Sequence, residues 1–573
     1  MASVRTVAGA LSGLLFVGVA GAAAPQHVDN FALLDQNGKH HELYYLSDMK
    51  AVVLMTHEND CDAVTETLPA LEAAKTAYAG KGVEFLLVNA EDARSAIAGN
   101  SQGSIPVLVD ERRLVSESLQ LKRASEVVVI DPKGWKVAYR GPVTARKDNL
   151  LNNALDAVIA GQPVKKAKVS AKGCSIKLAK TGSAGKHISY SNEIAPMLID
   201  NCLTCHRTNG IGPFAMTDYN VVRGFAPMIR EVVRTRRMPP WHADPHVGVF
   251  KDTRGLTTEQ AQKLVHWIEA GAPRGKGPDT LAEYKKQWSE WAFGKPDAVV
   301  EVPAFDVPAT GIVDYQRYVV ANPTGRDVWV RATDVIPGDR AVVHHVIVGV
   351  WDPKMPERER RYRSSSPELG AYVPGNGPTL YPQDTGVFVR KDESIAFQMH
   401  YTTSGKAAHD VTRFGLYFHD TPPKYTFRTA VLANPKISIP ANTKAHTESF
   451  TGPQFPRDIL LYRLTPHAHF RGTASNFVAK YPNGQEELLL SVPKYDFNWQ
   501  TTYVLAEPKV IPAGTKIVHS TTYDNSTQNP ANPDPNRVVP WGEQSFDEML
   551  YGVVQYREMT PDAEKVSQAQ SGG

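Results

Sequence analysis

The spacing of apolar and polar residues divides the chain into three regions. Residues 25–165 contain short apolar runs, and a helical pattern of apolar positions extends from Leu68 to Tyr78 between the first two of them. The runs lie at 51–55, 83–90 and 125–141. Apolar runs that alternate with a helical pattern predict an α/β domain.

The other two regions have different periods. Residues 190–275 have helical periodicity, which predicts a small all-α domain. Residues 298–560 contain many short alternating runs split by Pro, Gly and Asn, as in all-β proteins. This stretch is long enough for two sandwiches, which we place at 298–440 and 441–560. We therefore expect a multidomain protein with an α/β domain, an all-α domain and an all-β pair of sandwiches.

The remaining segments are terminal or connecting. Residues 1–24 contain one Arg, an apolar run and then small residues, the pattern of a secretory signal peptide cleaved near Ala22–Ala24. A membrane anchor is the alternative, but the apolar run is short and rich in Ala and Gly. Residues 166–189 are basic and aperiodic and predict a linker, and the polar residues 561–573 predict a loose tail. We expect a periplasmic or secreted protein without a transmembrane segment.

Composition changes this picture in three ways. A formal net charge of +3 gives no electrostatic footprint for nucleic acid. Four Cys in 573 residues are too few for a disulfide-dense scaffold. Histidine is more informative, because many of the 18 His lie in the C-terminal half.

The sequence NCLTCH at 201–206 contains a Cys-x-x-Cys-His motif. Its thiols, Cys202 and Cys205, can bond covalently to the vinyl groups of a haem while His206 ligates the iron. A thioredoxin-type thiol pair would not need the histidine. A zinc site would need two more close ligands, and no second Cys pair exists. The motif therefore predicts one covalently bound haem c.

The sixth iron ligand is expected downstream of this motif. In RRMPPWHADP, Met238 precedes a rigid Pro-Pro turn that can present its thioether from a loop. Such a ligand would raise the reduction potential relative to two histidines. The competitors are Met216, Met228, His242 and His246. Together with the following AQKLVHWIEAGAP helix, the segment resembles small cytochrome c domains.

The first domain resembles thioredoxin-like redoxins. The stretch AVVLMTHENDCDAVTETLPALEAAKTAY is similar to their first strand, active-site turn and helix, and SIPVLVD is similar to the segment that carries their cis-proline, here Pro106. The second Cys of a Cys-x-x-Cys pair would fall at Val64. The hydroxyl residue that peroxiredoxins place three positions before the reactive Cys is replaced by Glu58.

These replacements argue against a dithiol exchange cycle. Two alternatives are open for Cys61: it is a possible redox thiol, or it pairs with Cys174 in a structural disulfide. Because the resolving thiol and the activating hydroxyl are both absent, we favour a non-catalytic scaffold.

The stretch VVHHVIVGV at 342–350 predicts a buried strand that contains two adjacent histidines. Successive side chains of a strand point to opposite faces. His344 and His345 are therefore either one core residue and one surface residue, or two chelators on a twisted or bulged strand. Downstream, FQMHYTT adds His400 on another predicted strand.

A second group follows in TPHAHFRG, where His467 and His469 at i, i+2 fall on one strand face, and in FDEMLYG, which adds Met549. Imidazole plus thioether suits copper that must visit Cu(I). The order His-His, His, His-x-His, Met over an all-β region resembles the copper type II, ascorbate-dependent monooxygenases. The resemblance implies two copper ions in two sandwiches across a solvent cleft, one held by the first three histidines and one, which binds O₂, by His467, His469 and Met549.

The combination resembles bacterial fusions of a redoxin, a cytochrome c and a copper monooxygenase-like region. It implies an exported copper-dependent monooxygenase that hydroxylates a small organic substrate with O₂, with electrons from an external donor passing through the fused haem. Thr465 occupies the position of the carboxylate-binding Arg of peptide-hydroxylating members, which argues against a peptide-glycine substrate. The alternative is a non-hydroxylating haem and copper electron-transfer or copper-handling protein.

Overall fold

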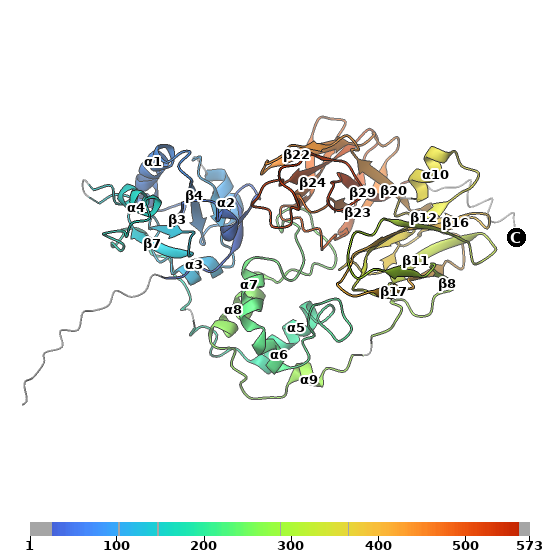
Figure 1. Ribbon diagram of the computed structural model, residues 1–573, viewed down its shortest axis with the longest axis horizontal. Helices are drawn as coiled ribbons and strands as arrows, with labels where there is room; N and C mark the ends of the chain where they lie inside the picture. Colours follow the sequence, from blue (N-terminus) through green and yellow to red (C-terminus); the bar gives the residue numbers. More distant parts are fainter. Residues whose placement is uncertain are drawn as a thin grey trace, which may run out of the picture.

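The computed structural model describes residues 26–560, apart from Ser101, Gln102, Arg146, Lys147, Thr181, Gln287 and Ser365. The expected signal peptide and the expected tail therefore lie outside the described residues. Figure 1 shows an α/β domain at one end, a strand-rich sandwich at the other, a second sandwich between them and a group of short helices beside these three parts.

The N-terminal domain is built on a seven-stranded sheet with the order β2-β1-β5-β4-β3-β6-β7. The strands are β1 Ala32–Asp35, β2 His40–Glu42, β3 Ala51–His57, β4 Val83–Asn89, β5 Val107–Val109, β6 Val127–Asp131 and β7 Lys136–Gly141. The helices are the 3₁₀ turn η1 Leu43–Leu46, α1 Asp62–Ala77, α2 Arg94–Asn100, α3 Leu114–Leu119 and α4 Leu150–Ile159. The central strands β3 and β4 are parallel and almost entirely buried, as their continuous apolar runs require.

The α/β prediction for this domain is confirmed, and two details differ. Helix α1 begins at Asp62, six residues before the predicted Leu68, because its first turn is polar and carries an acidic residue that suits a helix N-terminus. The cis-proline expected at Pro106 is wrong: in the part of the chain that the structure describes, the one cis peptide bond is Met238-Pro239.

The segment 190–283 contains short helices separated by long loops. They are the single π-turn η2 Tyr190–Ile194, α5 Ala195–Asn201, α6 Tyr219–Gly224, α7 Ala226–Arg234, α8 Thr258–Glu269 and α9 Thr280–Glu283. Helix α8 starts at a capping box, in which Thr257 accepts from the Gln260 amide and the Gln260 side chain accepts from the Thr257 amide. Trp267 is fully buried against Tyr190 in a core that this segment shares with Leu114 of α3. The helices are few and short, so the structure does not support the expected small all-α cytochrome c domain.

The expected linker forms no long helix or strand in its described residues, yet it is attached to the first domain. The Val169 amide donates to the Arg140 carbonyl (2.9 Å), and the Ala124 amide donates to the Cys174 carbonyl (2.9 Å). A disulfide joins Cys174 to Cys61. The linker is therefore packed along the α/β domain.

The first sandwich packs the sheet β10-β16-β12-β13 on the sheet β19-β15-β11-β18-β8 around one hydrophobic core. Its strands are β8 Ala298–Glu301, β10 Gln316–Ala321, β11 Val328–Ile336, β12 Val343–Trp351, β13 Gly370–Tyr372, β14 Thr379–Leu380, β15 Thr385–Val389, β16 Ser394–Tyr401, β18 Arg413–Phe418 and β19 Tyr425–Thr426. A small ribbon pairs β9 Phe305–Val307 with β17 Ala408–Asp410, and helix α10 covers Glu357–Ser364.

The second sandwich packs the sheet β20-β29-β23-β26 on the sheet β22-β27-β24-β25. Its strands are β20 Arg428–Ala433, β22 His446–Thr451, β23 Ile459–His467, β24 Gly472–Lys480, β25 Glu486–Val492, β26 Tyr503–Ile511, β27 Lys516–Tyr523 and β29 Tyr551–Glu558, with β21 Ser438–Ile439 paired to β28 Val539–Pro540. Because β20 pairs with β29, the change of sandwich falls near residue 427, earlier than the expected boundary at 440.

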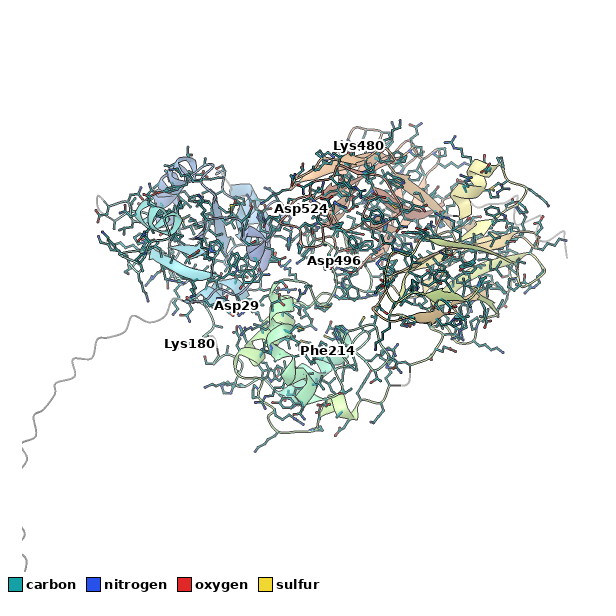
Figure 2. All side chains as sticks on the ribbon, viewed as in Figure 1. Asp29, Lys180, Phe214, Lys480, Asp496 and Asp524 are labelled. Atoms are coloured by element: carbon teal, nitrogen blue, oxygen red, sulfur yellow. A yellow bond between two sulfur atoms is a disulfide. The ribbon has the colours of Figure 1, made fainter. Side chains whose placement is uncertain are left out.

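Polar contacts join the first domain to the parts beside it. Arg94 Nη1 donates to both carboxylate oxygens of the buried Asp244, which lies in the loop between α7 and α8 (2.6 and 2.8 Å). The Tyr45 hydroxyl donates to Asp524 of the second sandwich (2.8 Å), and Figure 2 labels Asp524 at this junction. The first domain is thus docked on both neighbours.

The loop between α7 and α8 lies on the second sandwich. The Lys251 amide donates to the Val504 carbonyl, and the Ala506 amide donates to the Val249 carbonyl, each at 2.8 Å. These bonds extend the sheet at its edge strand β26. Among the described residues, no helix combines the length and apolar character needed to cross a bilayer.

Candidate functional site

The first candidate centre is formed by His344, His345 and His400 on the paired strands β12 and β16. His345 lies opposite His400 in the antiparallel register, and the register shifts between Val343 and His345. A bulge at this point lets two successive side chains reach one place. One imidazole nitrogen from each of the three histidines lies within 4.8 Å of the others. The structure therefore brings this predicted ligand set together.

The three imidazoles are kept in the neutral form that can bind a metal. Burial, and after it the charge of neighbouring histidines, lowers the pKa of His344 to about 3 and of His400 to about 4, and it lowers the pKa of His345 well below its ordinary value. All three are neutral at neutral pH, so their lone pairs are available. Nε2 of His344, Nε2 of His345 and Nδ1 of His400 are buried without a hydrogen-bond partner. Tyr315, which sequence reasoning missed, stacks on His400 with ring centroids 4.5 Å apart.

The second candidate centre begins where β23 ends, at His467. Its Nδ1 contacts the Gln500 side-chain oxygen at 2.6 Å, while the Gln500 amide nitrogen donates to the Phe497 carbonyl (3.2 Å). Because that second bond turns the amide oxygen of Gln500 towards the ring, Nδ1 must donate and Nε2 keeps its lone pair.

His469 is oriented in the same way. Its Nδ1 donates to the Asp547 carbonyl (3.2 Å), and its Nε2 is buried without a partner. The two histidine rings have centroids 5.2 Å apart. Burial lowers the pKa of His467 to about 4, and the pKa of His469 lies well below its ordinary value for the same reason. Each ring thus presents one free nitrogen.

Glu548 connects this histidine pair to Met549, and sequence reasoning missed it. Its carboxylate accepts from the backbone amides of His469 (2.8 Å) and Arg471 (2.6 Å). Burial raises its pKa to about 8. The Met549 carbonyl accepts from the Tyr523 hydroxyl (2.8 Å). An acidic residue beside a predicted ligand was the available signal, but the sequence could not reveal that its carboxylate folds back onto the His-x-His turn.

A cavity of about 1000 Å³ lies between the two sandwiches. His345 of the first centre and His467 and Met549 of the second line it. Its walls also include several aromatic side chains, namely Trp241, Phe293, Tyr315, Tyr381, Tyr462, Trp541 and Tyr551. The cavity therefore borders residues of both candidate centres.

The Cys-x-x-Cys-His motif follows helix α5. Cys202 and Cys205 are free thiols, and burial raises the pKa of both, that of Cys202 to about 12. Such protonated thiols are poor nucleophiles, unlike those of a dithiol oxidoreductase. The Nδ1 of His206 contacts the carbonyl of Phe214, labelled in Figure 2, at 3.0 Å. This bond leaves Nε2 of His206 as the free nitrogen, as an axial ligand requires.

The candidates for a sixth ligand differ in their surroundings. Met238 is partly buried, Met216 is 5% exposed in the helical core and Met228 is 52% exposed on α7. His246 is engaged, with its Nε2 at 2.5 Å from Glu111. His242 is buried and its Nε2 has no partner.

The redoxin site contains a disulfide between Cys61 and Cys174, with 5.9 Å between their Cα atoms. Two alternatives were open for Cys61, and in the structure it forms the disulfide with Cys174. Cys61 is the N-cap residue of α1, and Val64 lies buried in the first turn. The Glu58 carboxylate lies beside the two sulfurs, and burial raises its pKa.

Comparison with known proteins identifies the first domain. Residues 21–140 match the AhpC/TSA family, so this domain is a thioredoxin-like redoxin domain, while the family match leaves most of the chain uncovered. No curated protein matches the chain.

Several solved structures are similar to part of the chain. A hypothetical protein from Sinorhizobium meliloti 1021 is 24% identical, covers 28% of this chain and 96% of its own and has a TM-score of 0.25. An uncharacterized conserved protein from Geobacillus kaustophilus is 26% identical, with 27% and 92% covered and a TM-score of 0.24. A putative thiol:disulfide interchange protein, DsbE, from Chlorobium tepidum is 18% identical, with 24% and 96% covered and a TM-score of 0.21.

Proposed function

We propose that the protein is an exported copper-dependent monooxygenase that hydroxylates a small organic substrate with O₂ and receives electrons through a fused c-type haem. The observation that carries the proposal is the convergence of His344, His345 and His400 at a β-bulge, with buried nitrogens that lack partners. Buried polar atoms without partners are costly unless a ligand satisfies them.

The donor sets fit copper. Three neutral imidazoles would hold one ion, and His467, His469 and Met549 would hold the other, where the soft thioether favours Cu(I). When bound, such a pair supplies one-electron chemistry and activation of O₂. Gln500 and the Asp547 carbonyl hold the Nδ1 protons of His467 and His469, so that Nε2 of each ring would be the atom that binds the metal.

The cavity determines what the chain itself contributes to the reaction. Its aromatic walls would bind an apolar part of the substrate and exclude water from the reacting bond. His345, His467 and Met549 line the same space, so that a bound molecule would lie beside both donor sets. This shared access supports a reaction that uses both centres.

Cys202, Cys205 and His206 would hold the haem, with Met238 as the sixth ligand. The bond from His206 Nδ1 to the Phe214 carbonyl supports this assignment, because it fixes the ring and its tautomer. A c-type haem would supply electrons one at a time. The redoxin domain would serve as a docked scaffold, since Cys61 is paired with Cys174 and Val64 replaces a second thiol in the turn.

Oxygen consumption tests this function. The full chain, loaded with copper and haem and supplied with ascorbate, should consume O₂ in a substrate-dependent way when candidate small molecules are screened, and a His467→Ala variant should not. Copper and haem binding without substrate-dependent uptake of O₂ would favour the alternative, a periplasmic electron-transfer or copper-handling protein.

A further inference from the structure

The loop between β25 and β26, residues 493–502, lies between the two histidine clusters. Its Phe497 is 7% exposed. The Phe497 ring stacks on His344 of the first cluster, with centroids 4.6 Å apart and planes 22° apart. The same ring meets His469 of the second cluster edge-on, with centroids 5.6 Å apart and planes 82° apart. A buried aromatic ring is thus shared by the two centres, where the resemblance implied a solvent cleft.

The loop is anchored to the second centre at three points. The Tyr495 hydroxyl donates to the Ala468 carbonyl (2.7 Å) and accepts from the Ala468 amide (3.1 Å), between the two histidines of the pair. Phe470 packs against Phe497 with centroids 5.0 Å apart. The Gln500 side chain accepts from His467 Nδ1 and donates to the Phe497 carbonyl.

The first sandwich holds the same loop from the other side. The Asn376 side-chain nitrogen donates to the Gln500 carbonyl (3.0 Å), and the Thr502 amide donates to the Asn376 side-chain oxygen (3.2 Å). The Phe497 ring is therefore fixed by both sandwiches, and it cannot move without disturbing a histidine of each cluster.

We propose that Phe497 is a positioning residue that fixes the separation of the two metal centres and couples metal binding at one to metal binding at the other. This inference rests on the proposed two-copper function. A metal that fixes His344 also fixes the ring on which it stacks, and that ring limits the orientations of His469. Such a shared element gives a coupling free energy between two sites.

Copper-loaded full chain, studied by pulsed electron paramagnetic resonance, gives the distribution of Cu(II)–Cu(II) distances. We expect a narrow distribution for the natural protein and for Phe497→Tyr, which keeps the ring, and a broad one for Phe497→Ala and Phe497→Leu. Phe455→Ala is the matched control, because Phe455 packs against the same sandwich core away from both clusters. Leu keeps most of the side-chain volume, so it serves if the Ala variant does not fold.

A competition titration with a Cu(I) chelator measures the coupling directly. His344→Ala should change the Cu(I) affinity of the His467 site about fivefold or more in the natural background and have no such effect in Phe497→Leu. A narrow distance distribution in Phe497→Leu, or an unchanged effect of His344→Ala there, would overturn the inference. A natural protein that binds fewer than two coppers would instead refute the proposed function, and metal analysis separates the two results.

Discussion

His467 and His469 are each prepared for a metal by the atom that their Nδ1 touches. Gln500 accepts from the first ring and the Asp547 carbonyl from the second. The ligands themselves could be predicted from the His-x-His spacing. Their partners could not, because Gln500 is more than thirty positions away and is brought near by the loop before β26. The candidate ligands could thus be identified from the sequence, whereas their hydrogen-bond partners depend on the fold.

Replacing Gln500 by Leu should weaken copper binding at the second centre about tenfold, because the His467 ring loses the acceptor that selects its tautomer. Chelator competition measures the change. Gln555→Leu is the control, since Gln555 also lines the cavity but bonds Thr429. Equal affinities in the Gln500 variant and the natural protein would contradict the orienting role.

The buried histidines should make the metal-free protein acid-sensitive. Burial lowers the pKa of His519 to about 3, and its Nε2 bonds Ser475 (2.9 Å). At pH values between this pKa and the unfolded value near 6.5, the unfolded state binds a proton at His519 and the folded state does not. The contribution of His519 to the free energy of unfolding is therefore complete above pH 6.5 and is lost as the pH falls. The slope contributed by one such group is about 1.4 kcal/mol per pH unit.

The His519→Gln variant should therefore show a shallower loss of unfolding free energy between pH 6 and pH 4.5 than the natural protein, whatever its stability at neutral pH. Denaturant unfolding of the metal-free protein at several pH values measures the slope. Parallel slopes would show that His519 is not neutral and buried in the folded state.

At the scale of elements, the apolar runs located strands correctly. The runs at 51–55 and 83–90 became β3 and β4, and the stretch at 342–350 became most of β12. The bulge before His345 was foreseen as one of two possibilities, because adjacent histidines on a regular strand must diverge. Element ends were less predictable, as the polar first turn of α1 and the early change of sandwich at β20 show. Those ends depend on capping and strand pairing, which have no strong signature in the apolar pattern.

The bulge has a direct consequence for mutagenesis. His344→Ala and His345→Ala should each weaken the same copper, by about tenfold or more, while the other copper stays bound. Copper content and chelator competition on the purified variants measure this. If the two histidines were a core residue and a surface residue instead, one variant would unfold and the other would bind copper normally.

The disulfide ties the linker to the start of α1. Replacing Cys61 and Cys174 by Ala together should destabilise the redoxin domain by about 2 to 5 kcal/mol, because the bond closes a loop of 113 positions in the unfolded chain. Urea-dependent hydrogen exchange of β3 and β4 measures the loss. Peroxide turnover that disappears in a Cys61→Ser variant would contradict the scaffold role and assign the domain a thiol chemistry of its own.

At the scale of the whole molecule, the order of the domains in space differs from their order in the chain. Figure 1 shows the second sandwich between the redoxin domain and the first sandwich, with the helical segment beside them. Arg254, in the loop between α7 and α8 of that segment, donates to the Gly375 carbonyl of the first sandwich and lines the cavity. Apolar periodicity could predict the α/β domain and the strand-rich region separately. It could not predict this docking, which depends on polar contacts between residues far apart in the chain, such as Arg94 and Asp244.

The metal content of the purified, copper-reconstituted full chain tests the central claim most directly. We predict two coppers and one covalently bound haem iron per chain, falling to one copper when His344, His345 and His400 are replaced together by Ala and to one when His467 and His469 are replaced. The haem should stay attached through denaturation and acid-acetone extraction, because its thioether bonds are covalent. A chain that binds one copper or none, or whose copper content is unchanged by these replacements, would contradict the account.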